Sequence, residues 1–74
     1  MPAITITIHT EYIELNQLLK LAGACNSGGE GKMLVAEGLV KVDGHQELRK
    51  TCKIRTGQVV RYRDLEVHVA NEPK

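Results

Sequence analysis

Apolar and polar residues alternate strictly in two segments, one near each end of the chain. Residues 3–8 read Ala-Ile-Thr-Ile-Thr-Ile, so Ile4, Ile6 and Ile8 share one face. Residues 65–69 alternate in the same way, with the apolar side chains at every second position. A period of two places successive apolar side chains on one side of a sheet. The pattern therefore predicts two strands, each with a buried face.

Two short helices are predicted between these strands. The first has apolar residues at the spacing of one helical face, namely Leu15, Leu18, Leu19 and Ala22. Gly23 is expected to end it, and Gly38 to end a second helix over residues 28–37. Ser27 is a good N-cap for the second helix, and the Glu30 carboxylate is predicted to reach back to the Ser27 amide as a capping box.

The C-terminal half is predicted to be mainly β-structure. Residues 39–42 alternate as a strand with Lys41 pointing outward, and Asp43-Gly44 is a strong signal for a two-residue hairpin turn. Asp43 is assigned to this turn. Further strands are expected over residues 45–48, 51–54 and 59–62.

Length and composition limit the size and chemistry of the core. Seventy-four residues correspond to one small domain, residues 1–74. The chain has no Trp or Phe and only two Tyr, so the core must be aliphatic. Tyr12 and Tyr62 are assigned to the core or its rim.

The charge is distributed unevenly along the chain. The formal net charge is +1, yet the segment from Lys41 to Arg63 holds seven basic and two acidic residues, a net +5. The segments on either side are each −2. A one-sided positive field attracts a polyanion, although the same charges are compatible with a solvated hairpin.

A glycine-rich helix start accompanies the basic residues. Gly28, Gly29 and Gly31 are poor helix formers, so we expect them to allow either close contact between the two helices or close approach of a ligand. A phosphate-binding site would then be formed by Lys32 on the first turns of the helix, Lys41 on the following strand, and the free N–H groups at the start of the helix.

Metal, catalytic and membrane functions have little support. Cys25 and Cys52 lack metal spacing and are expected to be reduced, and the neighbouring Lys50 and Lys53 could lower the pKa of the Cys52 thiol. The three histidines, His9, His45 and His68, are scattered, so neither a metal nor another cofactor is predicted. No nucleophile–base–orienter set is visible, so we expect no enzyme. Met1-Pro2-Ala3 begins no signal peptide and no apolar run could span a membrane, which favours a cytoplasmic location.

Five segments together resemble a known family. They are residues 18–20 (Leu-Leu-Lys), 27–32 (Ser-Gly-Gly-Glu-Gly-Lys), 37–44 (Glu-Gly-Leu-Val-Lys-Val-Asp-Gly), 49–51 (Arg-Lys-Thr) and 57–60 (Gly-Gln-Val-Val), and they are similar to the S-four (S4) type RNA-binding domain, the alpha-L motif. The resemblance covers about residues 12–62, and the flanking strands fit the small stand-alone bacterial members, the YbcJ-like proteins. It implies an α+β class and the alpha-L RNA-binding fold, with two short helices packed on a small, mostly antiparallel β-sheet.

The resemblance also implies a function and a contact face. It implies non-catalytic binding of structured RNA, ribosomal RNA or tRNA, by a monomer that could act on a ribosomal particle. The contact residues carried over are Ser27, Lys32, Lys41, Arg49, Lys50 and Lys53. Arg49 is the preferred anchor because a guanidinium can bind two phosphate oxygens at once. The alternative is a small protein-interaction adaptor whose basic hairpin binds an acidic partner.

The RNA-binding hypothesis makes two predictions about geometry. Lys32, Lys41 and Arg49 should converge on one surface. Recognition should depend on the shape and charge of folded RNA, because a chain with so few aromatic residues offers little surface for base stacking.

Overall fold

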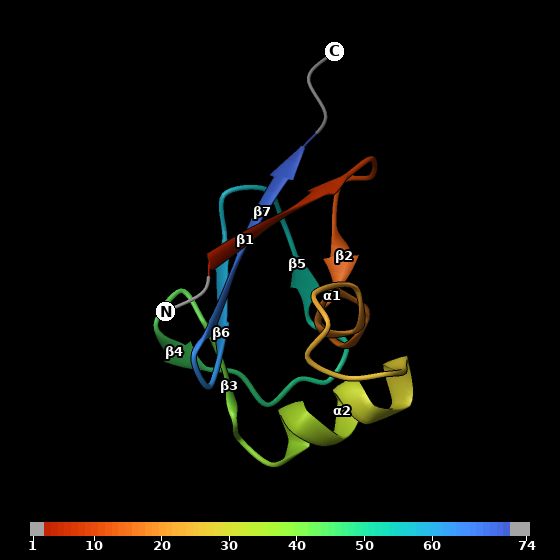
Figure 1. Cartoon of the computed structure of the whole chain (residues 1–74), viewed down its shortest axis with the longest axis vertical. Helices are drawn as coiled ribbons and strands as arrows, with labels where there is room; N and C mark the ends of the chain where they lie inside the picture. Colours follow the sequence, from red (N-terminus) through yellow and green to blue (C-terminus); the bar gives the residue numbers. More distant parts are fainter. Residues whose placement is uncertain (1–2, 72–74) are drawn as a thin grey trace.

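The two terminal strands lie side by side. The computed structural model describes residues 3–71; Met1 and Pro2, on which the argument against a signal peptide rests, and residues 72–74 lie outside this part. Strand β1 (Ala3–Ile8) pairs in parallel with β7 (Leu65–Asn71), as Figure 1 shows. The remaining pairs of the main sheet are antiparallel, and its strand order is β1-β7-β6-β3-β4. The predicted α+β class with a mostly antiparallel sheet is confirmed.

Three of the four strands predicted between residues 39 and 62 are shorter than expected, and the fourth, residues 59–62, has the predicted bounds. Strand β3 (Val40–Val42) lies between β6 (Val59–Tyr62) and β4 (His45–Gln46). A separate two-stranded ribbon joins β2 (Ile13–Glu14), which was not predicted, to β5 (Lys53–Ile54). Because β2 leads directly into the first helix, this ribbon connects the helices to the basic segment around Lys53.

Both helices end where the glycines predicted. Helix α1 (Leu15–Leu21) is followed by Gly23 with φ +83°, and α2 (Gly28–Ala36) by Gly38 with φ +78°. These left-handed backbone conformations favour glycine.

The capping arrangement at α2 differs from the prediction in one contact. The Ser27 hydroxyl oxygen accepts a hydrogen bond from the Glu30 N–H at 3.2 Å, as expected of an N-cap. The Glu30 carboxylate, however, accepts from the Asn26 N–H at 3.4 Å instead of reaching the Ser27 amide. The extended Ser27 backbone (φ −151°, ψ 161°) places the preceding amide within reach.

The helices cross at a glycine. A Cβ atom at Gly31 would lie 2.5 Å from the carbonyl oxygen of Asn16 on α1. Close to the same crossing, the Asn16 side-chain amide donates to the Gly28 carbonyl oxygen at 3.3 Å. Of the two explanations offered for the glycines, close helix contact therefore accounts for Gly31.

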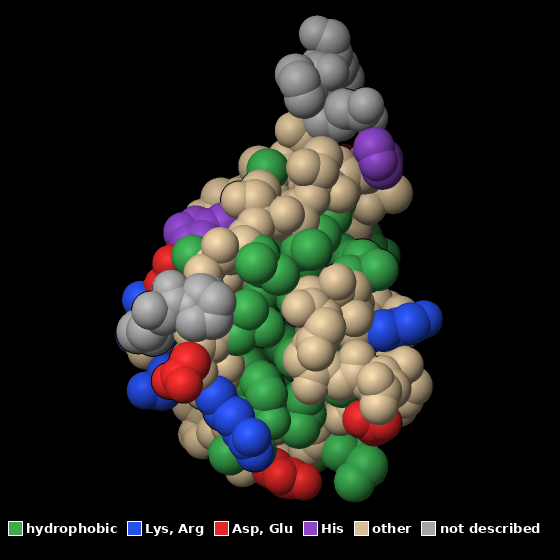
Figure 2. Space-filling view, viewed as in Figure 1, with side chains coloured by type: hydrophobic (Ala, Val, Ile, Leu, Met, Phe, Trp, Pro, Cys, Tyr) green, Lys and Arg blue, Asp and Glu red, His purple; other side chains and the backbone are tan. Residues whose placement is uncertain are grey.

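An aliphatic core joins the helices to the sheet. Its buried residues are Ile8, Leu15, Leu18, Leu19, Val35, Val40, Val42, Ile54, Val60, Val67 and Val69. Ile4 and Ile6 are only partly buried, although they pack against this core. Figure 2 shows hydrophobic side chains down the centre of one face, with the charged side chains toward its margins. Within residues 3–71, neither helix has the length and apolar character needed to cross a membrane.

Candidate nucleic-acid interface

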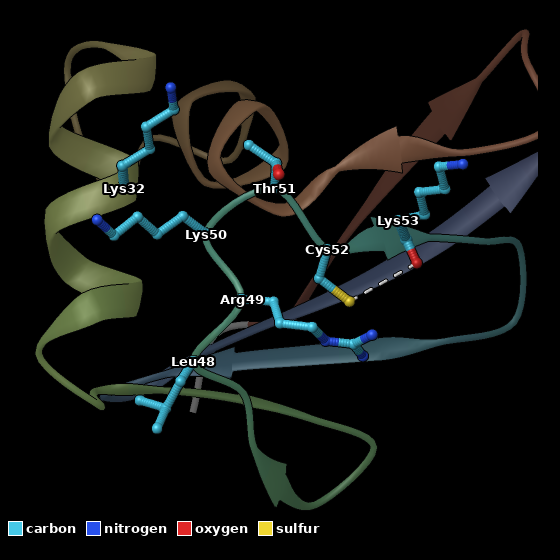
Figure 3. A pocket seen from close by; sticks show the side chains of 7 residues that line it. All are labelled: Lys32, Leu48, Arg49, Lys50, Thr51, Cys52 and Lys53. Atoms are coloured by element: carbon cyan, nitrogen blue, oxygen red, sulfur yellow. Dashed lines mark hydrogen bonds between the residues drawn. The ribbon is translucent and has the colours of Figure 1, made fainter.

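A basic hollow lies between α2 and the segment that follows β4. It is lined by Lys32 from α2 and by residues 48–53, as Figure 3 shows. Four of these seven lining residues are cations, namely Lys32, Arg49, Lys50 and Lys53, and none is an acid. We call this feature the basic hollow. Its positive charges come from two segments, with Lys32 on α2 and the other three cations within residues 48–53.

Two lysines line the basic hollow from different segments, Lys32 from α2 and Lys50 from the loop. The Ser27 cap begins α2 so that Lys32 lies one turn into the helix. In Figure 3 the Lys50 side chain extends from the loop toward α2, on the side where Lys32 lies. Both residues are exposed. Lysine ammonium groups on a solvated surface are suited to contact a phosphate backbone as point charges.

Arg49 is held by an acidic neighbour. Its Nη2 donates to Glu47 Oε1 at 2.8 Å and its Nε to Glu47 Oε2 at 3.1 Å. The same carboxylate accepts the backbone N–H groups of Leu48 and Arg49. In Figure 3 Arg49 extends away from Lys50. Because its guanidinium already binds a carboxylate, Arg49 is less available to phosphate than the sequence suggested.

The Arg49 guanidinium also fixes the charge of Glu47. Its hydrogen bond lowers the Glu47 pKa from 4.5 to about 2. A carboxyl group whose pKa falls on folding stabilises the fold above its unfolded pKa, and this contribution is lost as the pH falls through the folded pKa.

We therefore expect pH-dependent destabilisation by Glu47→Gln. The variant should melt below the parent above about pH 4.5, and the difference should shrink as the pH falls towards about 2. Thermal unfolding of both proteins between pH 7 and pH 2 measures this. A difference that stays constant over that range would show that the carboxylate charge is irrelevant to stability.

The prediction for the Cys52 thiol is wrong. Burial raises the Cys52 pKa, and the nearby Glu47 raises it further, which outweighs the opposing effect of Arg49. Sequence proximity to Lys50 and Lys53 suggested the opposite. The thiol is therefore protonated near neutral pH.

Lys41 lies apart from the other predicted contact residues. It is exposed on β3 opposite Arg61 of β6, and it lines a second hollow with residues of β6 and β7. Arg61 and His68 both pair with Glu66 there. Lys32 and Arg49 therefore meet in the basic hollow as predicted, but the structure does not bring Lys41 to them.

Two other residues of the motif have local structural roles. The Asp43 carboxylate accepts hydrogen bonds from the Val59 N–H at 2.9 Å and from the Gln58 side chain at 3.2 Å, which lower its pKa. This confirms its assignment to the turn. Ser27 uses its hydroxyl as the α2 cap and does not line the basic hollow, so its contact with RNA stays a prediction.

Comparison with known proteins identifies close relatives. A family model described as the S4 domain matches residues 6–70. The protein YbcJ of Escherichia coli (strain K12) is 50% identical over 58 residues, which cover 78% of this chain and 83% of YbcJ. The solution structure of YbcJ, described as having an alpha-L motif involved in RNA binding, superposes with a TM-score of 0.69 at 45% identity. The superposition covers 89% of this chain and 85% of that one.

A second relative has a name that refers to the ribosome. RlbA of Bacillus subtilis (strain 168), named as a probable ribosome maturation protein, is 42% identical over 55 residues. The aligned part covers 74% of this chain and 78% of RlbA. The region of this chain that the family model matches, residues 6–70, contains both helices and the basic segment.

Proposed function

The chain belongs to the S4 domain family, and from this premise we propose that it binds structured RNA through the basic hollow. The observation that carries the proposal is the meeting of four cations, without an acid, in the lining of one surface hollow. Phosphate contacts by Lys and Arg supply most of the sequence-independent affinity for nucleic acids. The description of YbcJ as having an alpha-L motif involved in RNA binding supports the same ligand.

Ribosomal RNA is the first ligand to test. The name of RlbA refers to ribosome maturation, which favours ribosomal RNA over tRNA. Lys32 and Lys50 would bind neighbouring phosphates of a folded RNA, and Lys53 would extend the contact along β5. Thr51, which lies between Lys50 and Lys53 in sequence, offers a hydroxyl for a further phosphate or ribose contact.

Binding without catalysis suits the chemistry of the basic hollow. Cys52 is the strongest nucleophile among its lining residues, and burial raises the pKa of that thiol. A protonated thiol is a poor nucleophile. We therefore propose that the lining residues serve recognition.

Two single variants test which surface contacts RNA. Lys50→Ala should weaken binding to a ribosomal RNA hairpin about three- to tenfold and should lower the slope of log Kd against log salt by about 1. Lys41→Ala, which removes the same charge from the second hollow, should change both quantities little. Filter binding or fluorescence anisotropy across a salt series measures both effects.

The outcomes separate RNA binding from the adaptor function. Equal losses in the two variants would mean that the sheet face carrying Lys41 contacts RNA as well. If the parent binds an acidic peptide as tightly as RNA at the same salt concentration, the adaptor function replaces the one proposed here.

A further inference from the structure

Beside the basic hollow, the Tyr12 ring forms a cluster with two cations. Its ring has the Lys53 Nζ 4.9 Å from the centroid and the Arg55 guanidinium carbon at 5.8 Å. The ribbon explains this arrangement, because Ile13 of β2 pairs with Ile54 of β5. Continuing that antiparallel register places Tyr12 opposite Arg55 and diagonal to Lys53.

Lys53 connects this cluster to the proposed RNA site. It lines the basic hollow and also contacts the Tyr12 ring. A phosphate backbone that follows Lys32, Lys50 and Lys53 would therefore reach the ring at the next step.

Tyr12 is exposed, whereas the other tyrosine is partly buried. Tyr12 is 36% exposed and is not among the residues packed against the core, whereas Tyr62 is one of them. Tyr62 also has an arginine over its ring, Arg63 at 5.3 Å, so a cation contact alone does not distinguish the two. What distinguishes Tyr12 is that it is exposed and contacts Lys53, a residue that lines the basic hollow.

We propose that Tyr12 is a stacking platform for an unpaired RNA base at the end of the basic hollow. Lys53 and Arg55 would bind the phosphates on either side of that nucleotide. Exposed cation–aromatic contacts are weak, so both side chains can leave the ring when phosphates arrive. Base stacking on an aromatic side chain is favourable and tolerates any base, because every base has a π-face.

This site adds a single-stranded element to the proposed function, on which it rests. The sequence suggested recognition by shape and charge alone. With Tyr12 beside the basic hollow, the preferred ligand becomes a paired RNA with an unpaired nucleotide at its end or in a bulge.

Tyrosine fluorescence tests the stacking directly. The chain contains two Tyr and no Trp, so Tyr12 is the only emitter in a Tyr62→Phe background. An RNA hairpin with a short single-stranded overhang should quench Tyr12 emission more strongly than a blunt hairpin with the same stem, at equal occupancy. A Tyr12→Phe protein that retains Tyr62 corrects for light absorbed by the RNA.

Affinities provide the second measurement. Tyr12→Leu should weaken binding of the overhang RNA about tenfold and leave the blunt hairpin nearly unchanged. Tyr12→Phe should bind both RNAs as the parent does, because the ring is retained. Circular dichroism melting of the variants checks that the fold is intact.

The results distinguish this inference from the proposed function. If Tyr12→Leu affects neither RNA and Tyr12 emission is unquenched, while Lys50→Ala still weakens binding, the stacking site is wrong and the RNA-binding function stands. If the parent binds neither RNA, both proposals are wrong. Equal losses on the two RNAs would show that Tyr12 supports the fold of the site and does not stack.

Discussion

Gly31→Val is expected to remove most of the protein's free energy of unfolding. The Cβ atom would lie 2.5 Å from the Asn16 carbonyl oxygen and 3.0 Å from the Asn16 Cα. Both are backbone atoms of α1, so no side-chain rotation relieves the clash and α2 must move away. Overpacking a tight contact costs about 1–3 kcal/mol or more, and a domain of this size has only roughly 3–5 kcal/mol of stability. Urea and thermal unfolding followed by circular dichroism measure the loss.

Gly29→Ala supplies a matched control on the same helix. A Cβ at Gly29 would meet only the Ser27 hydroxyl oxygen, at 3.8 Å, which is an ordinary van der Waals distance. Alanine favours helix over glycine by up to about 1 kcal/mol, so this variant should melt at or above the parent temperature. Gly31→Ala should melt clearly below it. If Gly31→Ala melts as the parent does, the two helices do not approach as closely as the structure shows.

The helix crossing also matters for the basic hollow. Lys32 directly follows Gly31, and the opposite side of the hollow is carried by residues 48–53. A substitution that moves α2 would therefore also move Lys32 relative to Lys50. Gly31, which lets the two helices pack closely, thus also fixes the distance between Lys32 and Lys50, whose charges are proposed to bind phosphate.

Sequence periodicity predicted the elements that local rules determine. The apolar spacing from Leu15 to Leu19 predicted α1, and each of the three leucines in it is fully buried. The Asp43-Gly44 turn was predicted because positive φ angles suit these residues, and both have them, +52° and +85°. Elements of two residues, such as β2, lack enough positions to show a period.

Long-range partners could not be read from the same rules. Alternation predicted that Lys41 points outward, but only the strand order, with β6 beside β3, places it next to Arg61 and away from Lys32. Counting charges showed a basic segment but did not show that Glu47 binds the Arg49 guanidinium. The cluster at Tyr12 depends on a two-residue ribbon that was not predicted.

The charge-reversed double variant Lys32→Glu/Lys50→Glu is expected to lose RNA affinity about a hundredfold at moderate salt. Two phosphate contacts would become repulsions, and the slope of log Kd against log salt should fall by about 2 because two fewer counterions are released. Both side chains are exposed, so the melting temperature should change little. Anisotropy titrations at several salt concentrations, with melting curves of the same samples, measure both quantities.

The control for this variant separates local contact from net charge. Lys20→Glu/Lys41→Glu makes the same change in total charge at exposed lysines outside the basic hollow. The field of the protein's net charge is screened within about 10 Å at 0.1 M salt, so its effect on RNA affinity should fade as the salt concentration rises. Direct contacts with phosphate, by contrast, determine the slope of log Kd against log salt. The control should therefore weaken binding only modestly, and mostly at low salt. If both double variants lose affinity equally at every salt concentration, RNA is attracted to the molecule as a whole and the basic hollow is not its binding site.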